Sequence, residues 1–170
     1  MRIELDNCVV RSWELSDAAS IAKYANNRKI WLHLRDAFPH PYTLDDAQRF
    51  LARVTTMEPE TYFAIAVGQE AVGSIGYGLR DDVERCSAEI GYWVAEPFWG
   101  RGIATAALRA VTQYAMQTHD LTRVYALPFD GNPASCRALE KAGFVLEGRM
   151  RKSAIKDGKI LDQLLYARVS

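Results

Sequence analysis

The sequence predicts an α/β fold, in which a single domain contains a mixed, mostly antiparallel sheet flanked by about four helices. Two observations predict it. Strand-like segments in the first half are joined by short turns, and strands joined in this way run antiparallel. Later, a strand, a long helix and a further strand follow one another, and this order places one parallel pair around the helix. The 170 residues, of which 49% are apolar, suffice for one core.

The first third of the chain predicts a strand followed by two helices. Residues Cys8–Trp13 are rich in β-branched and aromatic side chains, which indicates a strand. Ser16 and Asp17 offer a cap for a short helix. Thr43–Val54 predicts a clear helix, because its first residue can cap it, acidic residues fill its first turn and its apolar residues form one stripe. The segment Asn26–Tyr42 between the helices is predicted to be irregular.

The rest of the chain predicts strands around two further helices. The longest helix is expected over Gly102–His119, where apolar residues recur at helical spacing. A second begins after Asn132, a good N-cap, and ends before Gly143. The sequence "KDGK" at Lys156–Lys159 matches a type I′ turn between the last two strands. The expected strands are Thr61–Val67, Ala71–Arg80, Cys86–Val94, Arg123–Phe129, Phe144–Met150 and Ile160–Val169.

Composition excludes several classes of function. The chain has 21 basic and 21 acidic residues, so no overall charge favours nucleic acid, and no segment has the apolar length of a membrane span. The three cysteines, Cys8, Cys86 and Cys136, form no metal-ligand pattern, so no metal is expected. An odd number of cysteines without an export signal predicts reduced thiols and a cytoplasmic location.

The stretch "EPFWGRGIATAAL" at Glu96–Leu108 joins a strand to the longest helix. The first turn of a helix has N–H groups without helical partners, which makes an anion site. Gly100 and Gly102 remove Cβ atoms there, so a phosphate group can approach the backbone. The glycines can equally serve a tight turn and close helix packing. The stretch matches neither GxGxxG nor a P-loop, which argues against a dinucleotide-dependent oxidoreductase.

The stretches "AEIGYWVAEPFWGRGIATAAL" and "NPASCRALEKAGFVLEG" together resemble the GCN5-related N-acetyltransferases (GNAT), most closely the RimJ/RimL type of ribosomal-protein N-terminal acetyltransferase. The resemblance implies one GNAT-like N-acetyltransferase domain over residues 1–170, with a splayed parallel strand pair and acetyl-CoA as the acetyl donor. The family's diphosphate-binding pattern [QR]xxGx[GA] departs only at its first position here, and it falls on Trp99, Gly100, Arg101, Gly102, Ile103 and Ala104. The pantetheine arm is expected at the backbone of Trp93, Val94 and Ala95.

The resemblance also implies the catalytic residues. Many family members use a Tyr to protonate the departing thiolate, and this chain has Leu139 at that position. The RimJ/RimL type places a Ser three residues after the Asn, so Ser135 is expected to donate the proton and Asn132 to contact the cofactor arm. Without the resemblance, Asn132 is simply an N-cap.

Glu89 is the candidate base that accepts the proton of the amine. It lies in an otherwise apolar strand, where burial raises the pKa of a carboxylic acid. A structural ion pair with Arg85 or Arg80 is an equal alternative. By the same resemblance, close relatives of the RimJ/RimL type often carry a downstream Glu where this chain has Ala154, so a proton path relayed by water is also open.

The acceptor is expected to bind at the Asn26–Tyr42 segment, where Trp31, His33, Phe38 and Tyr42 can wall a groove or can belong to the core. The sequence therefore predicts transfer of acetyl from acetyl-CoA to a primary amine, either a protein N-terminus or a small molecule, by direct attack in a ternary complex. The alternative is a non-catalytic acyl-CoA-binding module, which the departures at Leu139 and Ala154 favour. Monomer and homodimer are both compatible with the sequence.

Overall fold

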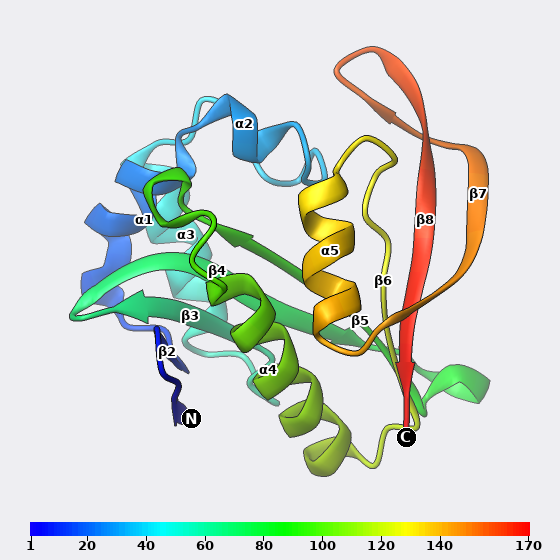
Figure 1. The fold of residues 1–170 in the computed structure, drawn as a ribbon. Coiled ribbons are helices and arrows are strands. Elements are labelled where there is room, and N and C mark those ends of the chain that lie inside the picture. Colours follow the sequence, from blue (N-terminus) through cyan, green and yellow to red (C-terminus); the bar gives the residue numbers. More distant parts are fainter. The chain divides into compact units, whose positions relative to one another are not determined.

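All residues from 1 to 170 are described by a computed structural model, which contains an eight-stranded mixed sheet and a set of helices (Figure 1). The strands are β1 (Arg2–Glu4), β2 (Val9–Ser12), β3 (Tyr62–Val67), β4 (Glu70–Leu79), β5 (Ser87–Val94), β6 (Arg123–Ala126), β7 (Val145–Lys156) and β8 (Lys159–Val169). The α-helices are α1 (Ala18–Ala25), α2 (Arg28–Trp31), α3 (Leu44–Val54), α4 (Ile103–His119) and α5 (Pro133–Lys141). Short 3-10 turns are η1 (Leu15–Asp17), η2 (Asp82–Glu84) and η3 (Glu96–Phe98).

The strand order β1-β2-β3-β4-β5-β6-β8-β7 contains one parallel pair, β5 with β6. The predicted α/β class and its parallel pair are confirmed. The chain forms two compact units. The first comprises Met1–Gly76 and Tyr92–Ala107, and the second comprises Tyr77–Gly91 and Leu108–Ser170. None of the helices combines the length and the apolar character that a membrane crossing requires.

The first unit has its core between α1, α3 and the strands β2 to β4. Residues from α1, α3, β3 and β4, together with Trp13 just after β2, form one buried cluster, and Phe50 and Trp93 pack against it. Helix α3 begins where the sequence predicts, because Thr43 and Asp46 cap its end reciprocally. The backbone N–H of Asp46 donates to Thr43 Oγ1 at 3.2 Å, and the N–H of Thr43 donates to Asp46 Oδ2 at 2.8 Å. The buried cluster consists of Trp13, Ile21, Ala25, Tyr42, Ala47, Leu51, Val54, Ala64 and Ala71.

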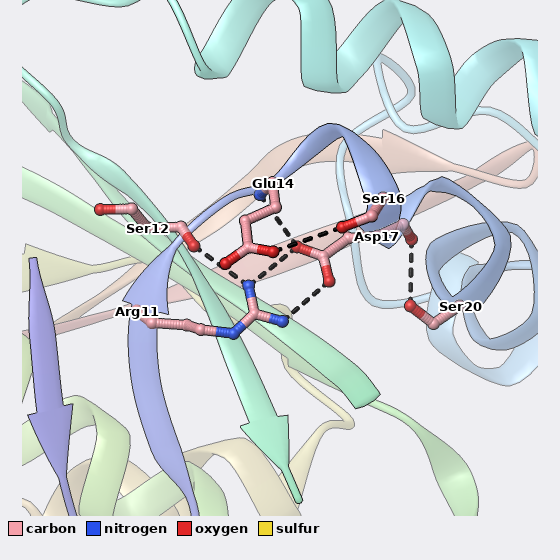
Figure 2. Close-up of polar contacts among 6 residues, drawn as sticks. All are labelled: Arg11, Ser12, Glu14, Ser16, Asp17 and Ser20. Atoms are coloured by element: carbon pink, nitrogen blue, oxygen red, sulfur yellow. Dashed lines mark hydrogen bonds and ion pairs between the residues drawn. The ribbon is translucent and has the colours of Figure 1, made fainter. Parts of the chain in front are cut away.

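A buried ion pair joins β2 to the first helical turn of this unit. Figure 2 shows the guanidinium of Arg11 facing the carboxylate of Asp17, and both of its hydrogen bonds are 2.8 Å long. The two side chains are only 11% and 6% exposed. Asp17 also accepts a hydrogen bond from the backbone N–H of Glu14 at 3.0 Å. The Asp17 carboxylate therefore accepts hydrogen bonds from both the Arg11 guanidinium and the Glu14 N–H at the start of η1. These bonds offset the cost of burying the carboxylate.

The second unit combines the parallel pair with an antiparallel hairpin. Ser87 is opposite Arg123 and Glu89 is opposite Tyr125, which places these four residues on one face of the sheet. Strand β8 pairs antiparallel with β6 and β7, and Figure 1 shows β7 and β8 as a long hairpin. Its turn has Asp157 at φ 51° and the next glycine at φ 72°, which confirms the predicted type I′ turn. Fully buried residues of this unit include Leu108, Val111, Val124 and Leu139.

The structure differs from the predicted elements in four places. Asn26–Tyr42 is not wholly irregular, because Asn27 caps the single-turn helix α2, so there are more helices than expected. Strand β1 was not predicted, since its few residues are held by pairing with β2 rather than by their own pattern. Strand β6 ends at Ala126, two residues before Pro128, which has no N–H to donate. Strand β7 extends to Lys156 because pairing with β8 continues past the predicted end.

Candidate functional site

The glycine loop, Gly100–Ala104, forms the start of α4 in the first unit. Gly100 has φ 75° and Gly102 has φ 74°, and a Cβ atom added at Gly100 would meet no atom within 4 Å. The backbone conformation itself therefore favours glycine at both positions. The helix makes its first bond from the N–H of Ala106 to the carbonyl of Gly102 at 3.0 Å. The N–H groups that precede Ala106 have no helical acceptor and are available to an anion.

Two side chains hold the glycine loop from outside. Asn7 Nδ2 donates to the carbonyl oxygen of Arg101 at 2.8 Å, across 94 residues of sequence. Trp99 Nε1 donates to the carbonyl oxygen of Val94 at 2.6 Å, although the indole is 46% exposed. Trp99, which departs from the family pattern, thus fastens the loop to the end of β5. Neither contact has a local sequence signal.

The predicted pantetheine residues form the end of β5. The backbone N–H of Ala95 donates to the carbonyl of Val72 at 2.7 Å, and a Cβ atom on Gly73 would lie 2.4 Å from the carbonyl oxygen of Trp93. Trp93 and Ala95 therefore turn their backbone groups toward β4, and alternation turns those of Val94 away from it. The carbonyl oxygen of Val94 already accepts a hydrogen bond from the Trp99 indole N–H. The backbone N–H of Val94 is therefore the remaining polar group on that edge.

The predicted acceptor residues divide into two groups. Phe38 packs against Tyr42 and Trp93, with ring centroids 4.9 Å and 6.0 Å apart. Tyr42 is only 6% exposed, and burial raises its pKa to about 12, so it is a core residue. Trp31 instead lies against the ring of His40 at 5.7 Å. His33 is exposed, although partial desolvation lowers its pKa. Phe38 is thus the one predicted wall residue that meets both the core and Trp93.

Glu96 links α2 to the turn that leads into the glycine loop. Its carboxylate accepts hydrogen bonds from Asn27 Nδ2 at 2.7 Å and from Lys29 Nζ at 2.6 Å. These bonds, first that of Lys29 and then that of Asn27, hold the pKa of Glu96 below its ordinary value. Sequence reasoning missed this connection because Lys29 and Asn27 lie 67 and 69 residues before Glu96 in the chain.

In the second unit, Glu89 forms an ion pair. Its Oε2 atom accepts a hydrogen bond from Arg80 Nη2 at 2.7 Å, and Arg80 Nε donates to the hydroxyl of Tyr125 at the same distance. Arg85 instead donates to the backbone carbonyl of Asp82 at 2.9 Å. Of the two ion-pair partners considered from the sequence, the structure therefore selects Arg80. The side chain of Glu89 is 23% exposed, which leaves it accessible for proton transfer.

Ser135 and Asn132 lie in the first turn of α5. The N–H of Ser135 donates to Asn132 Oδ1 at 3.3 Å, so Asn132 caps the helix as its residue type predicts. Both side chains are half-buried. Leu139, at the position where many relatives carry a Tyr, is 0% exposed and belongs to the core. Ala154 is half-buried in β7 opposite Leu161.

Comparisons with known proteins give a consistent result. A family model described as an acetyltransferase (GNAT) domain matches residues 7–145. The protein YdaF of Bacillus subtilis is 39% identical over 95 residues, which are 56% of this chain and 51% of that protein. A ribosomal-protein-serine acetyltransferase of Escherichia coli is 32% identical over 107 residues, covering 63% of this chain and 59% of the relative. The matched part therefore spans little more than half the length of these relatives.

Solved structures share the fold over nearly the whole chain. The structure of Mycobacterium smegmatis RimJ in complex with CoA-disulfide superposes with a TM-score of 0.85 at 25% identity. It covers 96% of this chain and 82% of its own.

Proposed function

The chain belongs to the GNAT acetyltransferases, and we propose that it transfers the acetyl group of acetyl-CoA to the N-terminal amine of a protein. The E. coli relative is a ribosomal-protein-serine acetyltransferase, which supports a protein as the acceptor, and RimJ of M. smegmatis is a structural neighbour. The transfer from acetyl-CoA is supported by the CoA-disulfide complex of that neighbour.

The observation that carries the proposal is the glycine loop. Positive φ at Gly100 and Gly102, open space at Gly100 and unused N–H groups at the head of α4 suit the diphosphate of a coenzyme A molecule. The contacts of Asn7 and Trp99 hold these groups before any ligand binds. Such preorganisation lowers the entropy that binding would otherwise cost. The N–H of Val94 is the group proposed for the pantetheine arm.

The proposed chemistry needs one proton acceptor and one donor. Acetyl-CoA supplies an acyl thioester with a good leaving group. The neutral amine attacks its carbonyl carbon, a C–N bond forms, and the C–S bond breaks. Glu89 accepts the proton that the amine loses, and Ser135 donates its hydroxyl proton to the departing thiolate. Ser135 then regains a proton from water and Glu89 releases its proton to water, which restores both groups. Arg80, paired with Glu89, fixes the direction of that carboxylate.

The test measures the release of free thiol from acetyl-CoA with a panel of amines. The panel contains peptides with Ser, Ala or Met at the N-terminus, polyamines, amino acids and aminoglycosides. We expect release with peptides, and a Ser135→Ala variant with kcat at least about tenfold lower but a nearly unchanged KM for acetyl-CoA. Ser153→Ala is the matched control, because Ser153 is exposed in β7. Wild-type turnover in Ser135→Ala would remove Ser135 as the acid.

A non-catalytic acyl-CoA-binding module is the second candidate. It is favoured by Leu139, whose side chain has no hydroxyl and is buried in the core. Acetyl-CoA binding in calorimetry without thiol release from any amine would support this candidate against the transferase.

A further inference from the structure

A pocket of about 500 Å³ opens in the second unit and is lined in part by Arg80, the ion-pair partner of Glu89. We name it the β5–β6 pocket. Its lining comes from the connection between β4 and η2, from η2, from the first residue of β5, and from β6 and β8. Ser87, Arg123 and Tyr125 lie on the sheet face that carries Glu89. The proposed function gives no role to this pocket. Its chemistry follows from how its charged groups are paired.

Both arginines of the pocket are already neutralised. Arg80 contacts Glu89 at 2.7 Å, and Arg123 forms a bidentate pair with Glu147, with bonds of 2.9 Å and 2.5 Å. The two guanidinium groups also lie over the ring of Tyr125, with Cζ atoms 5.5 Å and 5.7 Å from its centroid. An anion entering the pocket would have to displace a glutamate from one of these arginines. The arginines therefore act as walls rather than as an anion site.

Two carboxylates of the pocket have no such compensation. Asp81 and Glu84 line the pocket, and neither side chain makes a hydrogen bond or an ion pair within 4 Å. Arg80 acts on Asp81 only as a nearby charge, since its direct contacts go to Glu89 and Tyr125. Asp82 and Arg85, on the same turn, do not line the pocket, and their charges offset one another. The lining holds two arginines and two acids, and because Glu89 and Glu147 pair with the two arginines, the charges of Asp81 and Glu84 are left uncompensated.

Ser87 adds a buried polar group that points to a ligand. Its side chain lines the pocket and the residue is only 8% exposed, yet the only polar contact of its hydroxyl is with Cys86 Sγ at 3.9 Å. A thiol sulfur is a weak hydrogen-bond partner, so this hydroxyl keeps capacity for a further hydrogen bond. Its oxygen can accept a hydrogen bond from an N–H donor that enters the pocket.

Ser87, a lining residue of the pocket, lies two residues before the proposed base Glu89 in β5. Ser87 and Glu89 are alternate residues of β5 on one face, so their Cα atoms are about 7 Å apart along the strand. In an extended peptide, side chains two residues apart lie on the same side and are separated by the same distance of about 7 Å. An acceptor whose N-terminal amine lies at Glu89 would therefore place the side chain of its second or third residue at the pocket.

We propose that the β5–β6 pocket binds a cationic group of the acceptor, the ammonium or guanidinium of a Lys or Arg at position two or three of its N-terminus. Asp81 and Glu84 supply the charge, Ser87 accepts a hydrogen bond, and the Tyr125 ring and Leu165 contact the aliphatic part of the side chain. The inference rests on the proposed function, which places the amine at Glu89. The second ammonium of a polyamine has the same chemistry and is the other source of such a group.

The experiment compares three peptides that differ only at positions two and three, with Lys-Lys, Gln-Gln or Glu-Glu after an N-terminal serine, and includes spermidine as a further arm. Thiol release is measured with saturating acetyl-CoA at low and high salt. We expect kcat/KM for the Lys peptide to exceed that for the Gln peptide by about five- to tenfold at low salt, with a smaller ratio at high salt. The Asp81→Asn/Glu84→Gln double variant is expected to lose most of this preference while its rate with the Gln peptide changes less than about twofold.

Asp82→Asn is the matched control, because it removes a charge from the same turn without touching the pocket, and it should keep the preference. Equal rates with the Lys and Gln peptides, a preference for the Glu peptide, or an unchanged preference in the double variant would each overturn the proposal. If spermidine is acetylated and depends on Asp81 and Glu84 while peptides do not react, the cation site stands and its source is the polyamine.

Failure of the proposed function is distinguishable from failure of this inference. If no amine releases thiol, the binding of the Lys and Gln peptides is measured directly by calorimetry with acetyl-CoA present. About fivefold tighter binding of the Lys peptide, lost in the double variant, would support the cation pocket even when the transferase proposal fails. Equal affinities would refute the pocket as well.

Discussion

Replacing Gly102 with alanine should weaken acetyl-CoA binding by about tenfold or more while the fold is retained. Gly102 has φ 74°, a conformation that costs an L-residue about 1–2 kcal/mol. A Cβ atom there would lie 3.5 Å from Asn7 Nδ2, which is an ordinary contact, so no clash adds to this cost. Alanine either keeps the positive φ at this cost in stability or relaxes to a negative φ. Relaxation would change the direction of the backbone N–H groups that follow.

The magnitude follows from the groups concerned. A hydrogen bond to a charged group contributes about 1.5–3 kcal/mol, and the loss of one bond between an N–H and the diphosphate corresponds to about tenfold or more in Kd. The backbone strain should lower Tm by about 2–4 °C for each kcal/mol in a chain of this size. The loss of affinity and the decrease in Tm can be separated by an alanine substitution at another glycine that has a positive φ but lies away from the glycine loop.

Gly68 provides that control. It lies in the turn between β3 and β4 with φ 61°, and an added Cβ atom would meet no atom within 4 Å. Gly68→Ala should therefore show a similar decrease in Tm without a change in acetyl-CoA affinity. Calorimetry gives Kd and thermal unfolding gives Tm for both variants. If Gly102→Ala binds acetyl-CoA as tightly as Gly68→Ala does, the assignment of the glycine loop as the diphosphate site is wrong.

Three further predictions concern the interactions around this loop and in the two units. Trp99→Phe removes the indole N–H that holds the glycine loop, and it should cost about 1 kcal/mol and lower Tm by about 2–4 °C; an unchanged Tm would show that this bond adds nothing. Asp17→Asn leaves a buried guanidinium without its counter-charge, and it should cost about 3–5 kcal/mol, or roughly 10 °C in Tm. Asp45→Asn, in an exposed pair with both side chains about 70% exposed, is the control and should change Tm by less than about 3 °C. Iodoacetamide at pH 7.5 should alkylate Cys86 before Cys8, because burial raises the pKa of Cys8 to about 11 while hydrogen bonds from Thr122 and Ser87 lower that of Cys86. Peptide mass spectrometry checks the order, and equal labelling of the two thiols would contradict it.

Local sequence signals were sufficient wherever a residue acts on its own neighbours. Thr43 and Asp46 cap α3, Asn132 caps α5, and the "KDGK" turn takes the positive φ values that its residues favour. Each of these depends on groups no more than three residues apart, so the pattern contains both partners. The motif stretches likewise predicted the GNAT family, which the family match confirms. The catalytic roles of Ser135 and Glu89 remain predictions.

Contacts between distant residues required the tertiary structure. The sequence left Arg80 and Arg85 as equal partners of Glu89, and only the fold of β4, η2 and β5 brings the guanidinium of Arg80 within 2.7 Å. It assigned no role to Asn7, whose partner carbonyl is 94 residues away.

The sequence by itself determined the family, the class of fold and the glycines at the head of the long helix, because these depend on local propensity and on contiguous motifs. The tertiary structure decided which charges are paired and which remain exposed in the β5–β6 pocket. The physical reason is that an ion pair depends on distances of a few ångströms between side chains, and such distances exist only once the strands that carry them are in register.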